Sequence, residues 1–212
     1  MEKKMFCYQC EQTVGCTGCT GNAGVCGKKA DTAKLQDELT GALIGLARAV
    51  DGAETISTKT GQIILEGLFT TVTNVNFDNA AIENMIQKVR AEKERLVPDC
   101  SKCQAPCGRT DDYDMQQLWN ADEDIRSLKS LILFGIRGMA AYAYHANVLN
   151  YEDAEVDHFF CEALFKIGYE ESVETLLPTV LKVGEINLKC MALLDKANTE
   201  TYGTPEPTDV TL

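Results

Sequence analysis

Residues 31–50 read DTAKLQDELTGALIGLARAV, and this stretch determines the fold class. Its large apolar residues recur at spacings of three and four, as one face of an α-helix requires. They are Leu35, Leu39, Leu43, Leu46 and Val50. Asp31 or Thr32 can cap the start of this helix, and Gly52 follows its end. The stretch therefore predicts a long amphipathic helix that packs on a core.

The same period predicts two further helices in the first half of the chain. One covers about residues 60–73. The next begins after an Asp78 N-cap and continues toward Leu96, with Phe77 and Ile82 spaced as a hydrophobic staple.

Three more helices are predicted in the second half, over about residues 122–147, 152–167 and 171–197. Gly168 is expected to end the middle one, and Pro178 is expected to kink the last helix or mark its start. The core-facing stripe of that last helix is expected to comprise Leu181, Leu188 and Met191.

Six helices without an alternating strand predict an all-α fold of two three-helix bundles, preceded by a Cys- and Gly-rich N-terminal loop. The expected divisions are residues 1–30 for the N-terminal loop, 31–97 for the first bundle, 98–121 for a Cys-containing connecting loop, 122–198 for the second bundle and 199–212 for a linker. Thr199 opens this linker, which contains two prolines.

The charge balance restricts the kinds of partner. The chain has 212 residues, of which 45% are hydrophobic, and a formal net charge of −12. This excess of acid argues against nucleic acid or an anionic membrane as a partner. No stretch has the roughly 18–20 apolar residues of a membrane helix, and no secretory signal is visible. We therefore expect a cytoplasmic protein in a reducing compartment.

Ten cysteines are then informative, because clustered thiols in a reducing compartment indicate metal or redox chemistry. Five of them fall within the first 26 residues: Cys7, Cys10, Cys16, Cys19 and Cys26. Cys7 and Cys10 form a Cys-x-x-Cys pair that can direct two thiolates to one site, and the intervening glycines let the backbone wrap closely. The other two ligands of a four-thiolate site must come from the remaining three cysteines.

The spacing alone leaves the metal open, because zinc accepts the same thiolates as an iron–sulfur cluster. A set of buried free thiols is a third interpretation, and the density of cysteines argues against it. A second group, Cys100, Cys103 and Cys107, is one ligand short of a full site, and we interpret it as loop thiols. His145 and His158 are interpreted as structural histidines, since neither has a second histidine nearby.

Several motifs together resemble the N-terminal helical domain of the hybrid-cluster protein family, also known as the hydroxylamine reductase or prismane family. They are MFCYQCEQT at Met5–Thr13, TGCT at Thr17–Thr20, VCGK at Val25–Lys28, LQD at Leu35–Asp37, CGRTDDYD at Cys107–Asp114, DIRSLK at Asp124–Lys129 and LKVGEINL at Leu181–Leu188. The resemblance covers nearly the whole chain, and the N-terminal cysteine motif is its most diagnostic part.

The resemblance implies that Cys7, Cys10, Cys19 and Cys26 bind a 4Fe–4S cluster, with Cys16 as a competing ligand. A 2Fe–2S cluster is the alternative, because the loop mixes the spacings of both types. It also implies a hydroxylamine or nitric oxide reductase whose hybrid cluster lies in domains absent from this chain. The chain alone is therefore expected to lack the reductase active site, and we assign it no catalytic residue.

Electron transfer is the leading functional hypothesis. Its expected partners are a redox donor protein and the hybrid-cluster domains of the full-length protein, and a homo-oligomer is compatible with the sequence. The alternatives are a zinc-stabilised helical interaction module and a redox sensor that uses the spare cysteines.

Overall fold

The all-helical fold class is confirmed. The computed structural model describes residues 4–10, 17–51, 53, 55–73, 75–97, 111–169 and 172–207. Within these ranges the chain forms seven α-helices and no extended strand. The helices are α1 (Ala30–Val50), α2 (Thr58–Thr70), α3 (Asn79–Leu96), α4 (Met115–Trp119), α5 (Glu123–Val148), α6 (Ala154–Tyr169) and α7 (Val173–Tyr202).

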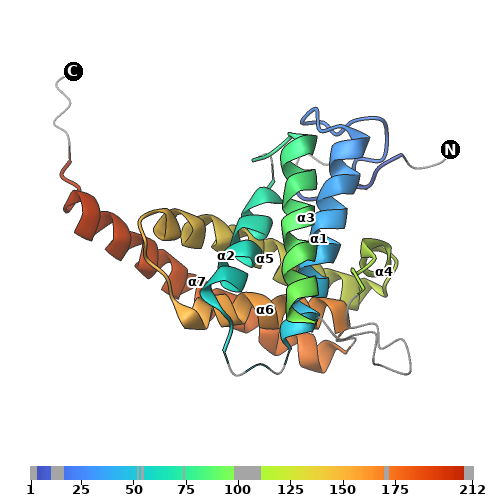
Figure 1. Cartoon of the computed structure of the whole chain (residues 1–212). Helices are drawn as coiled ribbons and strands as arrows, with labels where there is room; N and C mark the ends of the chain where they lie inside the picture. The colour runs from blue at the N-terminus through green and yellow to red at the C-terminus, as the bar shows by residue number, and fades with distance from the viewer. Residues whose placement is uncertain are drawn as a thin grey trace, which may run out of the picture.

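The long helices form two groups, α1–α3 and α5–α7, that cross one another. Helices α1 and α3 stand side by side, and α6 and α7 run across them (Figure 1). The two groups also touch, because α1 packs on α6 and α2 packs on α5. One buried apolar cluster contains side chains from both groups, among them Leu43, Ile64, Ile132 and Phe160. The division at residues 97 and 122 stays a prediction, and a continuous core links its two sides.

The stripe predicted for the first helix is confirmed. Leu39, Leu43 and Leu46 are fully buried, while Leu35 and Val50 are partly buried against the same core. The helix begins at Ala30, one residue before the predicted cap, and Asp31 accepts a hydrogen bond from the backbone N–H of Thr32 (2.8 Å). The hydrophobic period thus identified both the element and its buried face.

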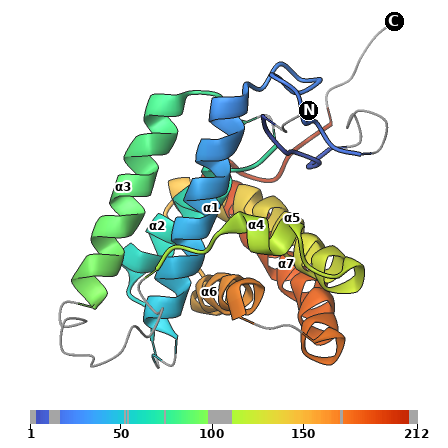
Figure 2. The ribbon, with the colours of Figure 1, turned by 90° about the vertical axis from the view of Figure 1, so that its right-hand side faces the viewer.

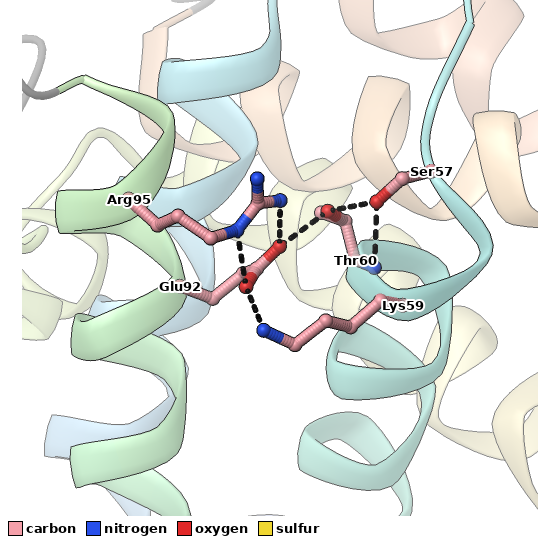
Figure 3. A network of polar contacts seen from close by, with 5 residues as sticks. All are labelled: Ser57, Lys59, Thr60, Glu92 and Arg95. Carbon is pink, nitrogen blue, oxygen red and sulfur yellow. Dashed lines mark hydrogen bonds and ion pairs between the residues drawn. The ribbon is translucent and has the colours of Figure 1, made fainter.

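Helices α2 and α3 are joined by a buried carboxylate. Asp78 caps α3 as predicted. Ser57 caps α2 by accepting a hydrogen bond from the N–H of Thr60 (3.2 Å). Helix α2 therefore starts two residues before its predicted position. Glu92 on α3 has a side chain only 1% exposed and lies among Arg95, Lys59 and Thr60 (Figure 3). Every oxygen of this buried charge is paired, as a buried charge requires.

Helix α4 was not predicted, because its five residues are too few for a periodic signal. It lies within the predicted connecting loop of residues 98–121. Asp114 caps it by accepting a hydrogen bond from the N–H of Gln116 (2.9 Å). Its Leu118 is fully buried, so the short helix covers one side of the core.

The expectation that Gly168 ends the fifth predicted helix is wrong, since α6 continues to Tyr169. A Cβ atom at Gly168 would lie 2.4 Å from Cγ2 of Ile44 and 3.2 Å from Nε of Arg48, both on α1. The Gly168 carbonyl also accepts a hydrogen bond from Nη2 of Arg48 (2.5 Å). The glycine therefore permits close approach of α6 to α1 rather than terminating the helix.

Helix α7 differs most from its prediction. Ser172 caps it by accepting from the N–H of Thr175 (3.3 Å), so the helix starts before Pro178. It continues to Tyr202, four residues into the predicted linker that begins at Thr199.

The core-facing stripe predicted for this helix is also wrong. Leu181 is 71% exposed, Leu188 67% and Met191 44%. The buried face instead carries Leu176, Thr179, Ile186, Cys190 and Ala197. Helix α7 therefore has two apolar faces, and only one of them contacts the rest of the described chain.

Candidate functional site

The N-terminal segment folds over the end of the bundle at which α1 begins (Figures 1 and 2). Cys7 and Cys19 pair in an isolated antiparallel bridge and exchange both backbone hydrogen bonds, at 3.1 and 2.7 Å between nitrogen and oxygen. A further bond joins the N–H of Lys4 to the carbonyl of Thr20 (3.1 Å). The backbone alone therefore places the first predicted ligand beside the third.

A second turn positions Cys26. The N–H of Gly24 donates to the carbonyl of Lys28 (2.7 Å), and the N–H of Gly27 donates to the carbonyl of Gly24 (3.0 Å). Gly27 has a φ of +87°, a conformation that L side chains rarely adopt. This tight turn leads directly into α1, so Cys26 is held close to the helical body.

The four cysteines predicted as ligands line one cavity. Its lining residues are Met5, Cys7, Gln9, Cys10, Cys19, Gly24, Val25, Cys26, Lys28 and Thr73. A Cβ atom at Gly24 would lie 3.5 Å from Sγ of Cys26 and 3.8 Å from Sγ of Cys19, so a side chain there would occupy the space beside both sulfurs. The glycine leaves this space open between the thiols.

Aromatic side chains on both sides of Cys7 anchor the segment to the helices. Phe6 and Tyr8 each pack edge-on against Trp119 of α4, with ring centroids 5.7 and 5.0 Å apart. Tyr8 also packs against Phe134 of α5 and hydrogen-bonds to the Ser130 hydroxyl. The sequence analysis did not predict this anchor, although the aromatic residues on either side of Cys7 could have indicated that the segment packs against the helices.

A buried arginine lies behind this segment. Arg137 of α5 is 4% exposed, and burial lowers its pKa to about 10, while nearby Asp37, Cys7 and Tyr8 oppose that shift. Burial also raises the pKa of Asp37 to about 6 and raises the pKa of Tyr8 above its ordinary value. At neutral pH the guanidinium is a fixed positive charge close to Cys7.

Of the other cysteines, the two that the structure describes do not join this cavity. Cys161 and Cys190 are buried on α6 and α7, and burial raises the pKa of each to about 12, as expected for inert core thiols. Cys16, Cys100, Cys103 and Cys107 lie outside the described residues. In the described ranges, no three His, Cys, Asp or Glu side chains are gathered closely enough to hold a metal ion.

The donor set nevertheless fits an iron–sulfur cluster in kind. Four thiols, the ligands that such clusters use, face a cavity that also has Met5 and Val25 in its wall. Cys7 and Cys10 come from one stretch of chain and Cys19 and Cys26 from a second, so ligands can approach from two sides. None of the described helices is long and apolar enough to cross a membrane.

Comparison with known proteins gives a consistent result. The Prismane/CO dehydrogenase family matches residues 5–212. The chain is 41% identical to a hydroxylamine reductase of Porphyromonas gingivalis over its whole length, and 42% identical over 97% of its length to one of Chlorobaculum tepidum. A hydroxylamine reductase of Methanococcus vannielii is 40% identical over 98% of the chain. The chain spans about two fifths of the length of these relatives.

The fold and the site thus define an all-helical protein whose N-terminal loop presents four thiols to one cavity. The chain belongs to the Prismane/CO dehydrogenase family, which matches it over almost its whole length.

Proposed function

We propose that this chain is the iron–sulfur electron-transfer domain of a hydroxylamine reductase-like hybrid-cluster protein, with Cys7, Cys10, Cys19 and Cys26 as cluster ligands. The observation that carries the proposal is the shared cavity, because four cysteines from two separate stretches of chain line the same small space. Relatives about 40% identical are named hydroxylamine reductase, which supports the reaction class. A cluster bound here would supply reversible one-electron transfer.

The chain's own residues account for how such a site is held. The antiparallel backbone pairing of Cys7 with Cys19 fixes these two residues relative to each other, and the turn at Gly27 sets the position of Cys26. Phe6 and Tyr8 fasten the Cys7 strand to α4 and α5. These contacts restrict the thiols before any ligand binds, which lowers the ordering cost of binding.

We further propose that, in a protein as long as the matched relatives, the exposed apolar face of α7 contacts the hybrid-cluster domains. Leu177, Leu181, Leu188 and Met191 follow one another at helical spacings on this face, and each is at least 44% exposed. The C-terminal part of α7 also extends beyond the other helices (Figure 1). An exposed apolar stripe of this kind indicates an interaction surface. A redox donor protein completes the proposed electron path.

Serine substitution of single cysteines tests the ligand assignment. We expect Cys7→Ser, Cys10→Ser, Cys19→Ser and Cys26→Ser each to lose most of the iron bound after anaerobic purification. Cys16→Ser and the buried Cys161→Ser, the matched control, should keep it. Retention of iron by Cys19→Ser together with its loss in Cys16→Ser would show that the assignment is wrong.

The α7 contact needs a separate test. The remaining domains of a relative can be expressed alone and mixed with this chain, and binding followed by calorimetry. Leu181→Asp and Leu188→Asp should weaken binding at least tenfold, whereas Glu174→Gln on the same helix should not. Equal binding by all variants would contradict the proposed surface.

A further inference from the structure

Arg137 is held rigidly by two threonines. Its Nη2 donates to Oγ1 of Thr40 (2.7 Å), and its Nε donates to Oγ1 of Thr71 (3.0 Å). Each hydroxyl donates its own proton to a helix carbonyl, Thr40 to that of Gln36 and Thr71 to that of Leu68 (both 2.8 Å). The hydroxyl lone pairs are therefore directed at the guanidinium, which fixes its place beneath the N-terminal segment.

This guanidinium is close to the thiol cavity. Cys7 lines the cavity and, like Tyr8, lies close enough to Arg137 to interact with it electrostatically. Thr73, two residues beyond the Thr71 that binds Arg137, lines the same cavity and donates to the carbonyl of Gln9 (3.4 Å). One short segment after α2 thus connects the arginine to the cavity wall.

A second buried cationic residue lies close to the cavity. Lys28 is only 2% exposed and is one of the residues that line the cavity, where its carbonyl accepts a hydrogen bond from the N–H of Gly24 (2.7 Å). The carboxyl of Asp37 lies near both cations and is influenced by each.

The buried guanidinium of Arg137 is incompletely paired within the described residues. Asp37 interacts with both Arg137 and Lys28, yet the Nη1 atom of Arg137 is buried without a hydrogen-bond partner among the described residues. A buried unpaired charge or donor is costly, so such an arrangement indicates a missing anion. An iron–sulfur cluster with four thiolate ligands is an anion, and one-electron reduction makes it more negative.

We propose that Arg137 and Lys28 are charge-compensating residues that favour the reduced state of the cluster and so raise its reduction potential. The inference rests on the proposed cluster at Cys7, Cys10, Cys19 and Cys26. Fixed positive charge in a low-dielectric interior stabilises the more negative of two redox states. The electron comes from an external donor, and no bond in the protein forms or breaks.

The test is a potentiometric titration of the full chain with its cluster, followed by the electron paramagnetic resonance signal of the reduced cluster. Arg137→Gln and Lys28→Gln remove one charge each. We expect each to lower the ratio of reduced to oxidised cluster at least tenfold at a fixed potential, which is about 59 mV for a one-electron couple. Arg137→Lys keeps the charge and should shift the midpoint by less than half as much.

Lys88→Gln is the matched control for net charge, because the Lys88 side chain is 61% exposed and lies on α3. It should leave the midpoint unchanged, since solvent screens an exposed charge. Wild-type midpoints in cluster-loaded Arg137→Gln and Lys28→Gln would overturn the proposal. If Arg137→Gln fails to fold, Lys28→Gln decides alone. A wild-type chain that never shows a reduced-cluster signal would refute the cluster assignment itself, a result distinct from unshifted midpoints.

Discussion

Replacing Glu92 by glutamine removes the central charge of the contact between α2 and α3. Its two carboxylate oxygens accept hydrogen bonds from Nη2 and Nε of Arg95 (2.6 and 3.0 Å) and from Oγ1 of Thr60 (2.8 Å), and Nζ of Lys59 lies 2.9 Å away (Figure 3). Glutamine has nearly the same shape but carries no charge and cannot accept all of these bonds. The substitution therefore tests the charge and leaves the packing in place.

The size of the effect follows from the pKa of Glu92. Hydrogen bonds from Arg95 foremost, and from Lys59 and Thr60, lower this pKa from 4.5 to about 2, against the opposing effect of burial. At about 1.4 kcal/mol per pH unit this corresponds to about 3 kcal/mol. Because the side chains of Arg95 and Lys59 are 51% and 66% exposed, solvent screening reduces the expected contribution to about 2 kcal/mol.

The pH dependence has a definite sign. A carboxyl whose pKa is lower in the folded state stabilises the fold fully above its unfolded pKa, near 4.5. This contribution is lost as the pH falls through the folded value, near 2. The free-energy difference between wild type and Glu92→Gln should thus be about 2 kcal/mol at pH 7 and shrink steadily below about pH 4.5.

Urea unfolding followed by circular dichroism, in reducing buffer at several pH values, measures this difference. Glu94→Gln is the matched control, because Glu94 is exposed on the same helix. It should change the free energy of unfolding by less than about 0.5 kcal/mol. A Glu92→Gln variant as stable as wild type at pH 7, or a deficit that does not change down to pH 2, would refute the reasoning.

Three further predictions concern packing, cluster loss and activity. Gly168→Ala should lower the free energy of unfolding by about 1–3 kcal/mol in urea titrations, because its Cβ would clash with Ile44. Gly138→Ala on α5 is the control, because Gly138 has open space around it and the added methyl group should not destabilise the fold. Equal effects of the two substitutions would contradict the close α1–α6 contact. Chelation of the cluster should leave the helical circular dichroism nearly constant while hydrogen exchange rises within residues 4–30, and cooperative loss of most helical signal would contradict an independently packed bundle. The isolated chain with its cluster should not reduce hydroxylamine with reduced viologen dye, and metal-analysed turnover would show that the chain carries its own active site.

Hydrophobic spacing predicted most of the fold because the helices are long and amphipathic. Helices α1, α3 and α5 lie within a residue or two of their expected bounds. The errors have physical causes outside periodicity. Gly168 resembles a helix stop in sequence, but it marks a close helix–helix approach that only tertiary structure reveals. Leu181 and Leu188 form a genuine apolar stripe, and spacing alone cannot tell which of two apolar faces this chain buries.

The thiol ligands of the candidate site could be predicted from the sequence, but the residues that surround and anchor them could not. Cysteine spacing and the family resemblance pointed to Cys7, Cys10, Cys19 and Cys26, and the structure gathers these four around one cavity. Arg137 lies 111 positions or more from all of them in the sequence, so no local pattern could place it there. The anchor of Tyr8 on Trp119 depends on the same long-range packing.

The central claim, that four N-terminal thiolates bind an iron–sulfur cluster, is tested most directly by iron, sulfide and zinc analysis of the anaerobically purified chain together with its absorption spectrum. The account predicts a brown protein with broad visible charge-transfer bands and equal amounts of iron and sulfide. A colourless protein that holds one zinc ion per chain, and takes up no iron on anaerobic reconstitution, would contradict it.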